Sequence, residues 1–419
     1  MNVRPIKPLA EAREFLPHEI FFSTTDARGI ILNGNDVFAR VSGFSKPELI
    51  GRPHNIIRHP DMPRTAFALL WDNLHAGKPF VGYVKNMAKD GRFYWVFVVV
   101  VPISGERFLS VRFKPLTALL PKVEALYRAM LAAEEQAIGR GDGEKAAVAA
   151  GTGVAVAALK GLGFASYDAF GQLALNQEMK ARPDTYRPSG RKNFNRVHAL
   201  FLRLINLLDG TRGLEAEVST VLGIAEDFRL HAFNVNVAAM REGSAGRGLG
   251  VVADFLGVYA TELARTITGL RGQIAEITRI AELVNTRIAM AHLQMEMILF
   301  YEQELARSAA GEAPEELGIL AESFEASVGE AEGSVRECRA VLSALHGSQD
   351  EIGKAVVTIE MSQVLGLAEA AHIPDGAALA GMFSEFRGRI QSTRSQLAKI
   401  TQTVEELDQF AGMGMRGSG

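Results

Sequence analysis

The segment Gly51–Pro63, which reads GRPHNIIRHPDMP, constrains this chain more than any other stretch. It places two histidines, two arginines, an asparagine and an aspartate among three prolines. Proline fixes its own φ angle and restricts the residue before it, so we predict a stiff, irregular loop. A rigid loop rich in hydrogen-bonding groups suits the binding of a polar ligand. The same residues could equally form a surface loop that caps a helix beginning near Arg64.

Length and charge narrow the class of protein. The 419 residues predict about two to four domains with ample core. The formal net charge is −3, and no block of like charges indicates a nucleic-acid interface or a basic membrane patch. Cys338 is the single cysteine, which excludes a disulfide framework and a cysteine-based metal site. This composition is consistent with a reducing cytoplasm.

The sequence does not predict a membrane span. The longest uncharged run, Ala146–Leu159, is shorter than the roughly 20 residues that a membrane helix needs. It contains Gly151 and Gly153 and is followed by Lys160. The N-terminal residues lack the apolar core of a signal peptide. We therefore predict a buried helix in this run and do not expect membrane anchoring.

Residues 18–115 have the pattern of a mixed α/β domain. Short β-rich runs are separated by turn signals at Asp26–Gly29, Lys89–Arg92 and Ser104–Glu106. Two strands, short helices and three hairpin-linked strands predict an α+β fold, in which an antiparallel five-stranded sheet carries helices on one face. The expected strands are 20–23, 30–32, 81–87, 93–103 and 107–113, and the expected helices are 35–41 and 65–75.

This order of elements, together with the segment Gly51–Pro63, resembles a PAS sensor domain, and more closely the PAS domain of bacterial aerotaxis receptors. The part His54–Pro63 is specific, whereas a generic PAS domain would share only scattered glycines and the asparagine. The resemblance covers residues 18–115, about a quarter of the chain. The other matching stretches are 23–26, 35–38, 41–43, 84–86 and 94–95.

The resemblance implies FAD, bound without a covalent bond in a pocket between the sheet and the short helices. Arginine and histidine can hold a diphosphate or ribose, asparagine can read the flavin edge, and aromatic rings stack on a flat ring. Each residue also has a structural alternative: Asn35 as a helix cap, His59 bonded to a backbone carbonyl and Trp71 as plain core. The implied contacts are Asn35, Arg58, His59 and Asp61, with Trp71, Phe80 and Asn86 lining the pocket.

Two other states of this pocket stay open. Haem-binding PAS domains need an axial histidine, for which His54 or His59 could serve. The second alternative is a pocket that holds no tightly bound cofactor. A flavin–cysteine photoadduct is excluded, because no cysteine lies in this domain. The related family often has tryptophan where this chain has Phe80, so ring stacking is expected to differ there.

Residues 116–192 are expected to form a helical connector. The apolar stripe of Lys122–Ile138 predicts a helix leaving the sheet. The glycines of Gly139–Gly143 break it, and the run Ala146–Leu175 is weakly helical. Arg182–Gly190 has the composition of a loop. No chemical role follows for this connector.

From Asn193 onward the pattern changes to long helices. Apolar residues recur in steps of three and four on both sides of a glycine-rich break, which predicts an antiparallel helical hairpin. We expect a helical bundle over 193–411 with a hairpin tip near 243–250, a disordered tail over 412–419 and an N-terminal cap over 1–17. The two predicted seams are Leu214, Val218, Val221, Ala225, Phe228, Ala232, Val235 and Ala239, and then Leu256, Tyr259, Leu263, Ile267, Leu270, Ile274, Ile277, Ala281, Val284, Ile288, Ala291 and Met295.

The break itself resembles the signalling tip of methyl-accepting chemotaxis receptors, with no gap over about thirty residues. The resemblance implies contacts with the chemotaxis coupling protein and a histidine kinase. Ala238 replaces a tip glutamate, and the family's paired methylation sites are not clear, so this coupling is open to test. The matching tip residues are Asn234, Arg241, Gly246, Arg247 and Gly248.

These features together predict a soluble cytoplasmic sensor, expected to be a homodimer. Its PAS domain would report redox or oxygen status through FAD, and its helical domain would relay that state in aerotaxis or energy taxis. The alternative is a scaffold or adaptor with an empty or haem-binding PAS domain and a tip that does not engage the chemotaxis kinase. An enzyme is not expected, because the chain has no kinase box, no phosphate loop and no His-x-x-x-His metal pair.

Overall fold

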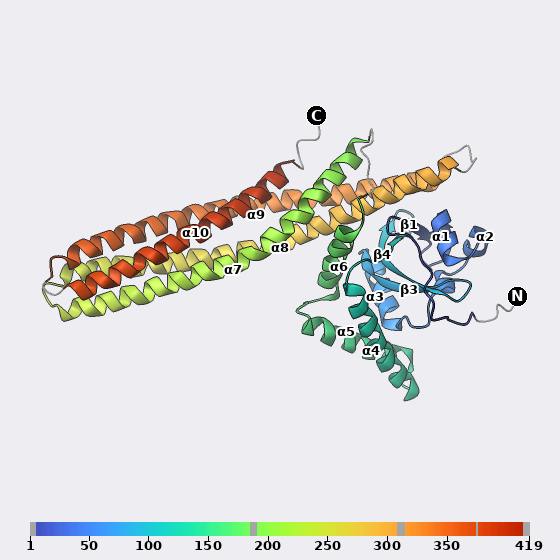
Figure 1. The fold of residues 1–419 in the computed structure, drawn as a ribbon, viewed down its shortest axis with the longest axis horizontal. Coiled ribbons are helices and arrows are strands. Elements are labelled where there is room, and N and C mark those ends of the chain that lie inside the picture. The colour runs from blue at the N-terminus through green and yellow to red at the C-terminus, as the bar shows by residue number, and fades with distance from the viewer. Residues whose placement is uncertain (1–5, 185–190, 308–314, 374–375, 414–419) are drawn as a thin grey trace. The chain divides into compact units, whose positions relative to one another are not determined.

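The computed structural model describes residues 6–184, 191–307, 315–373 and 376–413. Contacts divide the chain into two compact units. The first comprises Met1–Phe201 and Asn285–Ala331, and the second comprises Leu202–Val284 and Glu332–Gly419. Figure 1 shows the sheet and its short helices in the first unit and four long helices lying side by side in the second.

The first unit contains a five-stranded sheet in the order β2-β1-β5-β4-β3, in which all neighbours are antiparallel. This confirms the predicted α+β fold with short helices after the second strand. The strands are β1 (Ile20–Thr25), β2 (Ile31–Gly34), β3 (Phe80–Met87), β4 (Phe93–Ile103) and β5 (Arg107–Phe113), and the short helices are α1 (Asp36–Ser42), α2 (Lys46–Leu49), η1 (His54–Ile57) and α3 (Arg64–His75).

Side-chain alternation gives the sheet two buried faces. On the inner face, Phe21 of β1 and Tyr94 of β4 pack with Phe38 of α1 and Ile57 of η1 into one apolar cluster. Burial of aromatic and branched side chains supplies the main driving force for this layer. The outer face is covered as well, because every residue of β1 is buried although successive side chains point to opposite faces.

The proline-rich segment Gly51–Pro63 crosses the inner face from one edge of the sheet to the other. Pro53 forms a bridge with Ile30 beside the edge strand β2, and Arg58 forms a bridge with Asn86 of the opposite edge strand β3. These pairings, together with the fixed φ angles of the prolines, hold the segment in one conformation. The segment therefore forms a rigid wall over the sheet.

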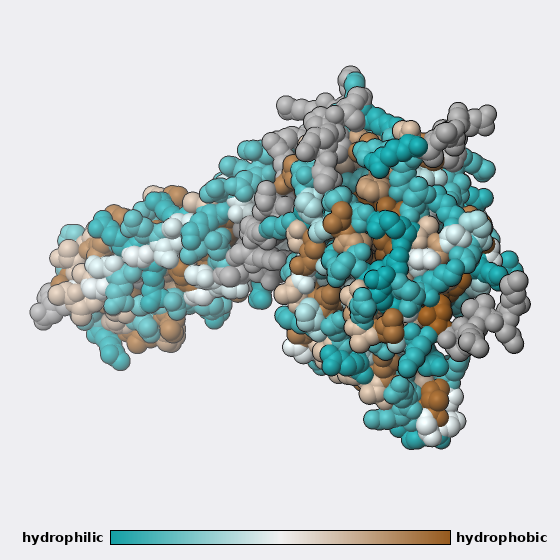
Figure 2. All heavy atoms as spheres, turned by 45° about the vertical axis from the view of Figure 1, so that its right-hand side comes forward, coloured by the Kyte–Doolittle hydropathy of each residue, from teal (hydrophilic) through white to brown (hydrophobic). Residues whose placement is uncertain are grey.

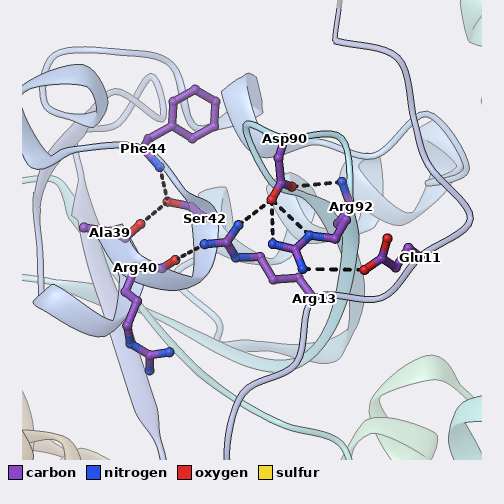
Figure 3. A network of polar contacts seen from close by, with 8 residues as sticks. All are labelled: Glu11, Arg13, Ala39, Arg40, Ser42, Phe44, Asp90 and Arg92. Atoms are coloured by element: carbon purple, nitrogen blue, oxygen red, sulfur yellow. Dashed lines mark hydrogen bonds and ion pairs between the residues drawn. The ribbon is translucent and has the colours of Figure 1, made fainter.

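Polar contacts bind the N-terminal segment to the hairpin that joins β3 and β4 (Figure 3). The Arg13 guanidinium donates to the Asp90 carboxylate at 2.7 Å and to the carbonyl of Arg40 at 2.7 Å. Arg92 donates to the same Asp90 oxygen at 2.7 Å and lies 3.6 Å from Glu11. The Arg13 guanidinium thus joins the N-terminal segment to helix α1 and to the hairpin.

The connector folds into three helices. The predicted weakly helical run 146–175 is in fact two helices with a break at residues 162–166. The break begins after Gly161, and Ser166 caps the next helix by accepting from the Ala169 amide at 3.2 Å. The helices are α4 (Leu119–Gly139), α5 (Gly143–Gly161) and α6 (Tyr167–Ala181).

A buried glutamate of α4 caps the start of α3. The Glu134 carboxylate is fully buried and accepts from the amides of Arg64 and Thr65, both at 2.9 Å, and from the Thr65 hydroxyl at 2.8 Å. A carboxylate at a helix N-terminus also interacts favourably with the helix dipole. This contact attaches the connector to α3.

A second fully buried glutamate, Glu178 of α6, attaches the connector to the sheet. It accepts from the Tyr83 hydroxyl of β3 at 2.8 Å and from the Leu116 amide just before α4 at 2.6 Å. The Thr117 hydroxyl donates to it at 2.6 Å. One carboxylate therefore joins β3, the end of the sheet and the start of α4.

Part of a long helix, α8 (Arg247–Arg307), packs on the outer face of the sheet. The ring of Tyr301 meets that of Phe22 edge-on at 4.9 Å between centroids. Glu296 accepts from Arg182 at 2.6 Å, and both side chains are buried. Residues 285–307 thus belong to the first unit, whereas the sequence placed all of 193–411 in one bundle, because this stretch of α8 finds its apolar partners on the sheet.

The second unit is built from two helical hairpins, α7–α8 and α9–α10. The predicted seam of α7 is buried from Val218 to Ala239, and Leu214 lies outside the residues whose side chains are described. Asp227 of α7 pairs with Arg389 of α10, and Glu360 of α9 pairs with Arg394. The predicted tail lies outside the described residues from 414 on. The remaining helices are α7 (Lys192–Arg241), α9 (Glu315–Ala370) and α10 (Ala377–Met413).

Both hairpins close with a glycine that packs against a helix carbonyl. A Cβ on Gly246 would lie 2.0 Å from the carbonyl oxygen of Ala239, and one on Gly376 would lie 2.1 Å from that of Ala370. Backbone atoms cannot move aside as the end of a long side chain can. Both turns therefore require glycine for steric reasons, independent of any role in binding.

We predict that Gly246→Ala destabilises the helical unit by about 1–3 kcal/mol, because the new methyl group overlaps the Ala239 carbonyl. Gly223→Ala in α7 is the matched control, since a Cβ there meets nothing within 4 Å and alanine favours helix. Thermal unfolding followed by circular dichroism at the helix band measures both. Equal melting temperatures for the two variants would contradict the steric argument.

Candidate functional site

A cavity of about 310 Å³ lies inside the N-terminal domain. Its floor is the inner face of the sheet, one side is helix α3, and the segment Gly51–Pro63 closes the other side. Its volume is at the lower end of the range of ligand pockets, about 300–1,000 Å³. The lining residues are Thr25, Arg28, Gly29, Pro53, His54, Asn55, Arg58, Phe67, Leu70, Trp71, Leu74, Val84, Asn86, Val98, Val100, Phe108, Ser110 and Arg112.

The alternation of side chains along the strands determines which polar groups form the floor of the cavity. In β5, Phe108, Ser110 and Arg112 share the inner face because side chains alternate with a period of two. Helix α3 contributes the opposite wall through residues such as Trp71, whose ring meets Phe108 edge-on at 5.8 Å between centroids. Apolar walls with a few fixed polar groups are the usual composition of a small-molecule site.

The most unusual group in the cavity is the guanidinium of Arg112. This side chain is 3% exposed and donates to the Ser23 hydroxyl at 2.9 Å and to His54 Nε2 at 2.5 Å. Its Nη1 has no hydrogen-bond partner, and no described carboxylate pairs with it. Burial lowers the pKa of Arg112 to about 10, which leaves it charged at neutral pH. A buried cation without a counterion strongly favours an anionic or electron-rich partner.

The protonation state of His54 follows from this contact. Arginine has no acceptor atom, so Nε2 of His54 must accept, and the ring is neutral with its proton on Nδ1. Burial and the charge of Arg112 hold the pKa of His54 well below its ordinary value of 6.5. The ring also stacks on Phe38 with centroids 6.0 Å apart. His54 therefore orients the guanidinium without adding charge.

A second cation lies at the mouth of the cavity. The Arg58 guanidinium covers the Phe67 ring at 4.2 Å from its centroid and donates to the Met62 carbonyl at 3.1 Å. Burial and the nearby charge of Arg64 lower the pKa of Arg58, and the side chain stays positive. Arg28, which is largely exposed, lines the same mouth. Two guanidinium groups at an opening suit a phosphate group.

Three of the residues predicted from sequence line this cavity: Arg58, Trp71 and Asn86. The Asn86 side chain is 3% exposed, and its Nδ2 has no hydrogen-bond partner. An unpaired buried amide N–H is a strong donor for a ligand. The structure thus brings these three side chains together, and their contact with a cofactor stays a prediction.

Asn35 and His59 lie outside the cavity lining. The Asn35 amide donates to the Ile20 carbonyl at 3.1 Å, and its oxygen accepts from the Phe22 and Phe38 amides at 3.1 and 3.3 Å. It therefore joins β1 to the start of α1. His59 Nδ1 accepts from the Asp61 amide at 3.1 Å, which shapes the proline-rich segment.

Asp61 and Phe80 also lie outside the lining. The Asp61 carboxylate is exposed and pairs with Lys85 at 2.6 Å, across the segment and strand β3. Phe80 is buried in the apolar cluster next to the cavity and stacks on Tyr167 of α6 with centroids 5.8 Å apart. These positions support the cavity walls from behind.

Sequence reasoning missed the floor of the cavity. Ser110 and Arg112 belong to an expected strand and Thr25 lies just after the expected strand 20–23, but no function was assigned to them. The available signal was the position of Arg112 between Val111 and Phe113, since an arginine on an otherwise apolar buried strand is rare. Reading strand alternation would have put Ser110 and Arg112 on the same face as Phe108.

The predicted tip residues belong to the second unit. Arg241 ends α7, Arg247 begins α8, and both are exposed. Asn234 is exposed on α7. Gly246 is the buried turn residue, and a Cβ on Gly248 would lie 2.3 Å from the Glu369 carboxylate. The structure thus explains Gly246 by backbone packing, whereas the flexible Glu369 side chain could move away from a Cβ on Gly248, and the three polar residues lie on the surface.

Among the described residues, no group of three or more histidine, cysteine, aspartate or glutamate side chains could hold a metal ion. None of the described helices combines the length and apolar character that crossing a bilayer requires.

Comparison with known proteins agrees with this architecture. Residues 31–111 match the family model described as "PAS fold". The aerotaxis receptor of Escherichia coli is 44% identical over 112 residues, which are 26% of this chain and 22% of that protein. The nitrogen fixation regulatory protein of Klebsiella pneumoniae is 30% identical over 84 residues, 20% of this chain and 17% of that protein. The chain thus spans about a fifth of the length of these relatives.

Solved structures with a likeness to this chain include a PAS domain from Colwellia psychrerythraea, with a TM-score of 0.20 and 25% identity over 23% of this chain and 85% of that one. A second is the light-state structure of the Aureochrome1 LOV photoreceptor domain, with a TM-score of 0.23 and 20% identity over 25% of this chain and 87% of that one.

We predict that the N-terminal domain loses stability as the pH falls below 6.5, in part because of His54. Below this pH, His54 binds a proton in the unfolded chain but stays neutral in the folded chain. The free energy of unfolding therefore falls by up to about 1.4 kcal/mol per pH unit. Urea unfolding followed by tryptophan fluorescence reports this domain, which holds both tryptophans, Trp71 and Trp95.

The variant His54→Gln should lose less stability than the wild type between pH 6.5 and pH 5. His75→Gln is the control, because His75 is an exposed residue of the same domain. The same pH dependence in the His54 variant and the wild type would contradict the assignment of a neutral His54.

Proposed function

Since the N-terminal domain is a PAS domain with homology to part of the aerotaxis receptor, we propose that this chain is a signal-transduction protein that senses redox or oxygen status through bound FAD. The helical unit would relay that state in aerotaxis or energy taxis. The observation that carries the proposal is the cavity with two unpaired buried donors, Arg112 Nη1 and Asn86 Nδ2.

The residues of the cavity fit a flavin. Trp71 and Phe108 offer aromatic faces and edges, and the unpaired donors of Asn86 and Arg112 suit the carbonyl-rich edge of the ring. Arg28 and Arg58 at the mouth suit the diphosphate. The cavity volume of about 310 Å³ is within the range of small-molecule sites. When bound, the flavin supplies reversible uptake of electrons and protons.

Arg112 is the group most sensitive to charge in the cavity. Its guanidinium holds β1 through Ser23 and the proline-rich segment through His54. A change of charge on a group bound beside Nη1 would change its attraction to Arg112. The hydrogen bonds of Arg112 to Ser23 and His54 would then strengthen or weaken in response. A redox state would in this way be transferred to the strand and to the rigid segment on either side.

The connector helices are attached to the elements that surround the cavity. Glu134 caps α3, which carries Trp71, and Glu178 binds Tyr83 of β3, which carries Asn86. A small shift of α3 or β3 must therefore move a buried carboxylate of α4 or α6. We propose a population shift of about 1–3 kcal/mol between two arrangements, typical of coupling between sites.

The output is proposed to be a protein contact at the end of the second unit. Figure 2 shows hydrophobic residues among hydrophilic ones on the surface of that end. Around the turn between α7 and α8, Phe233, Met240, Val251 and Phe255 are each more than half exposed. Exposed apolar surface of this kind marks interaction sites. The resemblance to chemotaxis receptors makes the coupling protein and the histidine kinase the proposed partners, with the chain acting as a cytoplasmic homodimer.

The alternative is a scaffold whose PAS domain is empty or binds haem. His54 is the candidate axial ligand that lines the cavity, and its Nε2 lone pair accepts from Arg112. A haem iron would have to displace that hydrogen bond and would lie next to a guanidinium. This contact favours the flavin over haem.

We predict that Arg112→Gln weakens FAD binding at least tenfold, because the buried cation faces the cavity. Arg107→Gln is the matched control, since Arg107 lies on the same strand and does not line the cavity. Each full-length variant is refolded with FAD, and the bound flavin is measured by fluorescence titration. Equal affinity in the two variants would contradict the role given to Arg112.

We further predict that the immobilised full-length chain captures the purified chemotaxis coupling protein, and that Phe233→Ser together with Phe255→Ser abolishes the capture. These two exposed side chains are 66% and 56% accessible, so their replacement should leave the helices folded. Val156→Ser, an exposed apolar residue of the connector, is the control. No capture by the wild type would favour the scaffold alternative.

A further inference from the structure

A second and larger cavity, of about 460 Å³, lies among the helices that follow the sheet. Its walls come from α3, α4, α5 and the start of α6, all within the first unit. Helix α3 separates this second cavity from the cavity beside Arg112. Leu70 and Trp71 line the cavity beside Arg112, whereas Ala66 and Leu69 line the second cavity. The two spaces are therefore distinct and lie on opposite faces of one helix.

The walls of the second cavity are almost entirely apolar. Leu126 and Met130 of α4 face Ala155 and Leu159 of α5 across the space. The short side chains of α5 leave the space between the helices open, because alanine cannot reach the opposite wall. The remaining apolar lining residues are Ala66, Ala68, Leu69, Val123, Val148, Val156, Phe164, Ala165 and Phe170.

The polar groups inside the cavity are already satisfied. Tyr127 and Tyr167 each donate their hydroxyl to a backbone carbonyl of β3 at 2.9 Å. The Thr65 hydroxyl donates to Glu134 at 2.8 Å. A buried water needs about two to four polar partners, and these walls offer none that is free. Because an empty space of this size weakens packing, an apolar occupant would stabilise the fold.

Two charged side chains lie at the rim of the cavity. Lys160 of α5 and Asp72 of α3 are exposed, and neither forms an ion pair within the described part of the chain. One offers a donor and the other an acceptor, with no net charge between them. Such a rim suits a head group that both donates and accepts, such as a hydroxyl. A carboxylate gains no net attraction there, because the repulsion from Asp72 opposes the attraction to Lys160.

We propose that this cavity binds an uncharged amphiphile, a small molecule with an apolar body and a single hydroxyl head group. The body would lie between α4 and α5, and the head would lie at the rim near Lys160 and Asp72. This site is independent of the proposed flavin site, so the chain would carry two small-molecule sites, one on each face of α3.

The test uses the neutral apolar dye N-phenyl-1-naphthylamine, whose fluorescence rises in an apolar site, with the full-length chain. Ala155→Phe fills the cavity and should weaken dye binding at least tenfold without lowering the melting temperature. Ala157→Phe is the matched control, because Ala157 is an exposed residue of the same helix and does not line the cavity. Leu126→Phe fills the same space from α4 and should act like Ala155→Phe. No dye binding, or equal binding by all variants, would overturn the proposal.

Competition by matched amphiphiles identifies the head group. At neutral pH, 1-decanol should displace the dye at a concentration at least tenfold lower than decanoate does. Lys160→Met, which removes the donor, should weaken 1-decanol binding about fivefold, the value of one hydrogen bond, while Lys145→Met at the other end of α5 should not. Displacement by decanoate at the same or a lower concentration would overturn the uncharged head group.

Discussion

The hydrogen bonds of Arg112 to Ser23 and His54 organise the interior of the N-terminal domain. A buried guanidinium without a carboxylate costs free energy unless something compensates it. Here a neutral histidine and a hydroxyl orient the cation, and its remaining donor is unpaired in the cavity. The domain thus holds an unneutralised positive charge beside a ring-sized space. We regard this uncompensated charge as the physical basis of the ligand binding that we propose.

The surroundings of this charge are rigid, and so they can transmit a change. The segment Gly51–Pro63 is fixed at both edges of the sheet, which prevents it from relaxing around the cavity. Buried glutamates then connect α3 and β3 to the connector helices. A rigid wall and a capped helix move as units, so in the proposed function a local change in charge would become a displacement of helices. A flexible loop would absorb the same change without effect.

Much of this architecture could be predicted from the sequence. Strand alternation and turn residues located all five strands. Apolar residues spaced three and four positions apart located the buried seam of α7. The cavity floor was harder, because Arg112 lies far along the chain from Ser23 and His54. The register of β1 and β5 brings Arg112 to Ser23, and the crossing of the segment Gly51–Pro63 brings it to His54. The packing of Tyr301 on Phe22 was also beyond local patterns, since an apolar stripe does not reveal which surface it will cover. Long-range pairing decided both.

The absorption spectrum of the purified full-length chain decides whether the cavity beside Arg112 holds the proposed flavin. The proposed flavin binding predicts two bands between roughly 350 and 500 nm that dithionite bleaches and air restores. A protein that is colourless in this range and takes up no FAD on refolding, or one with the single intense band of a haem, would contradict it.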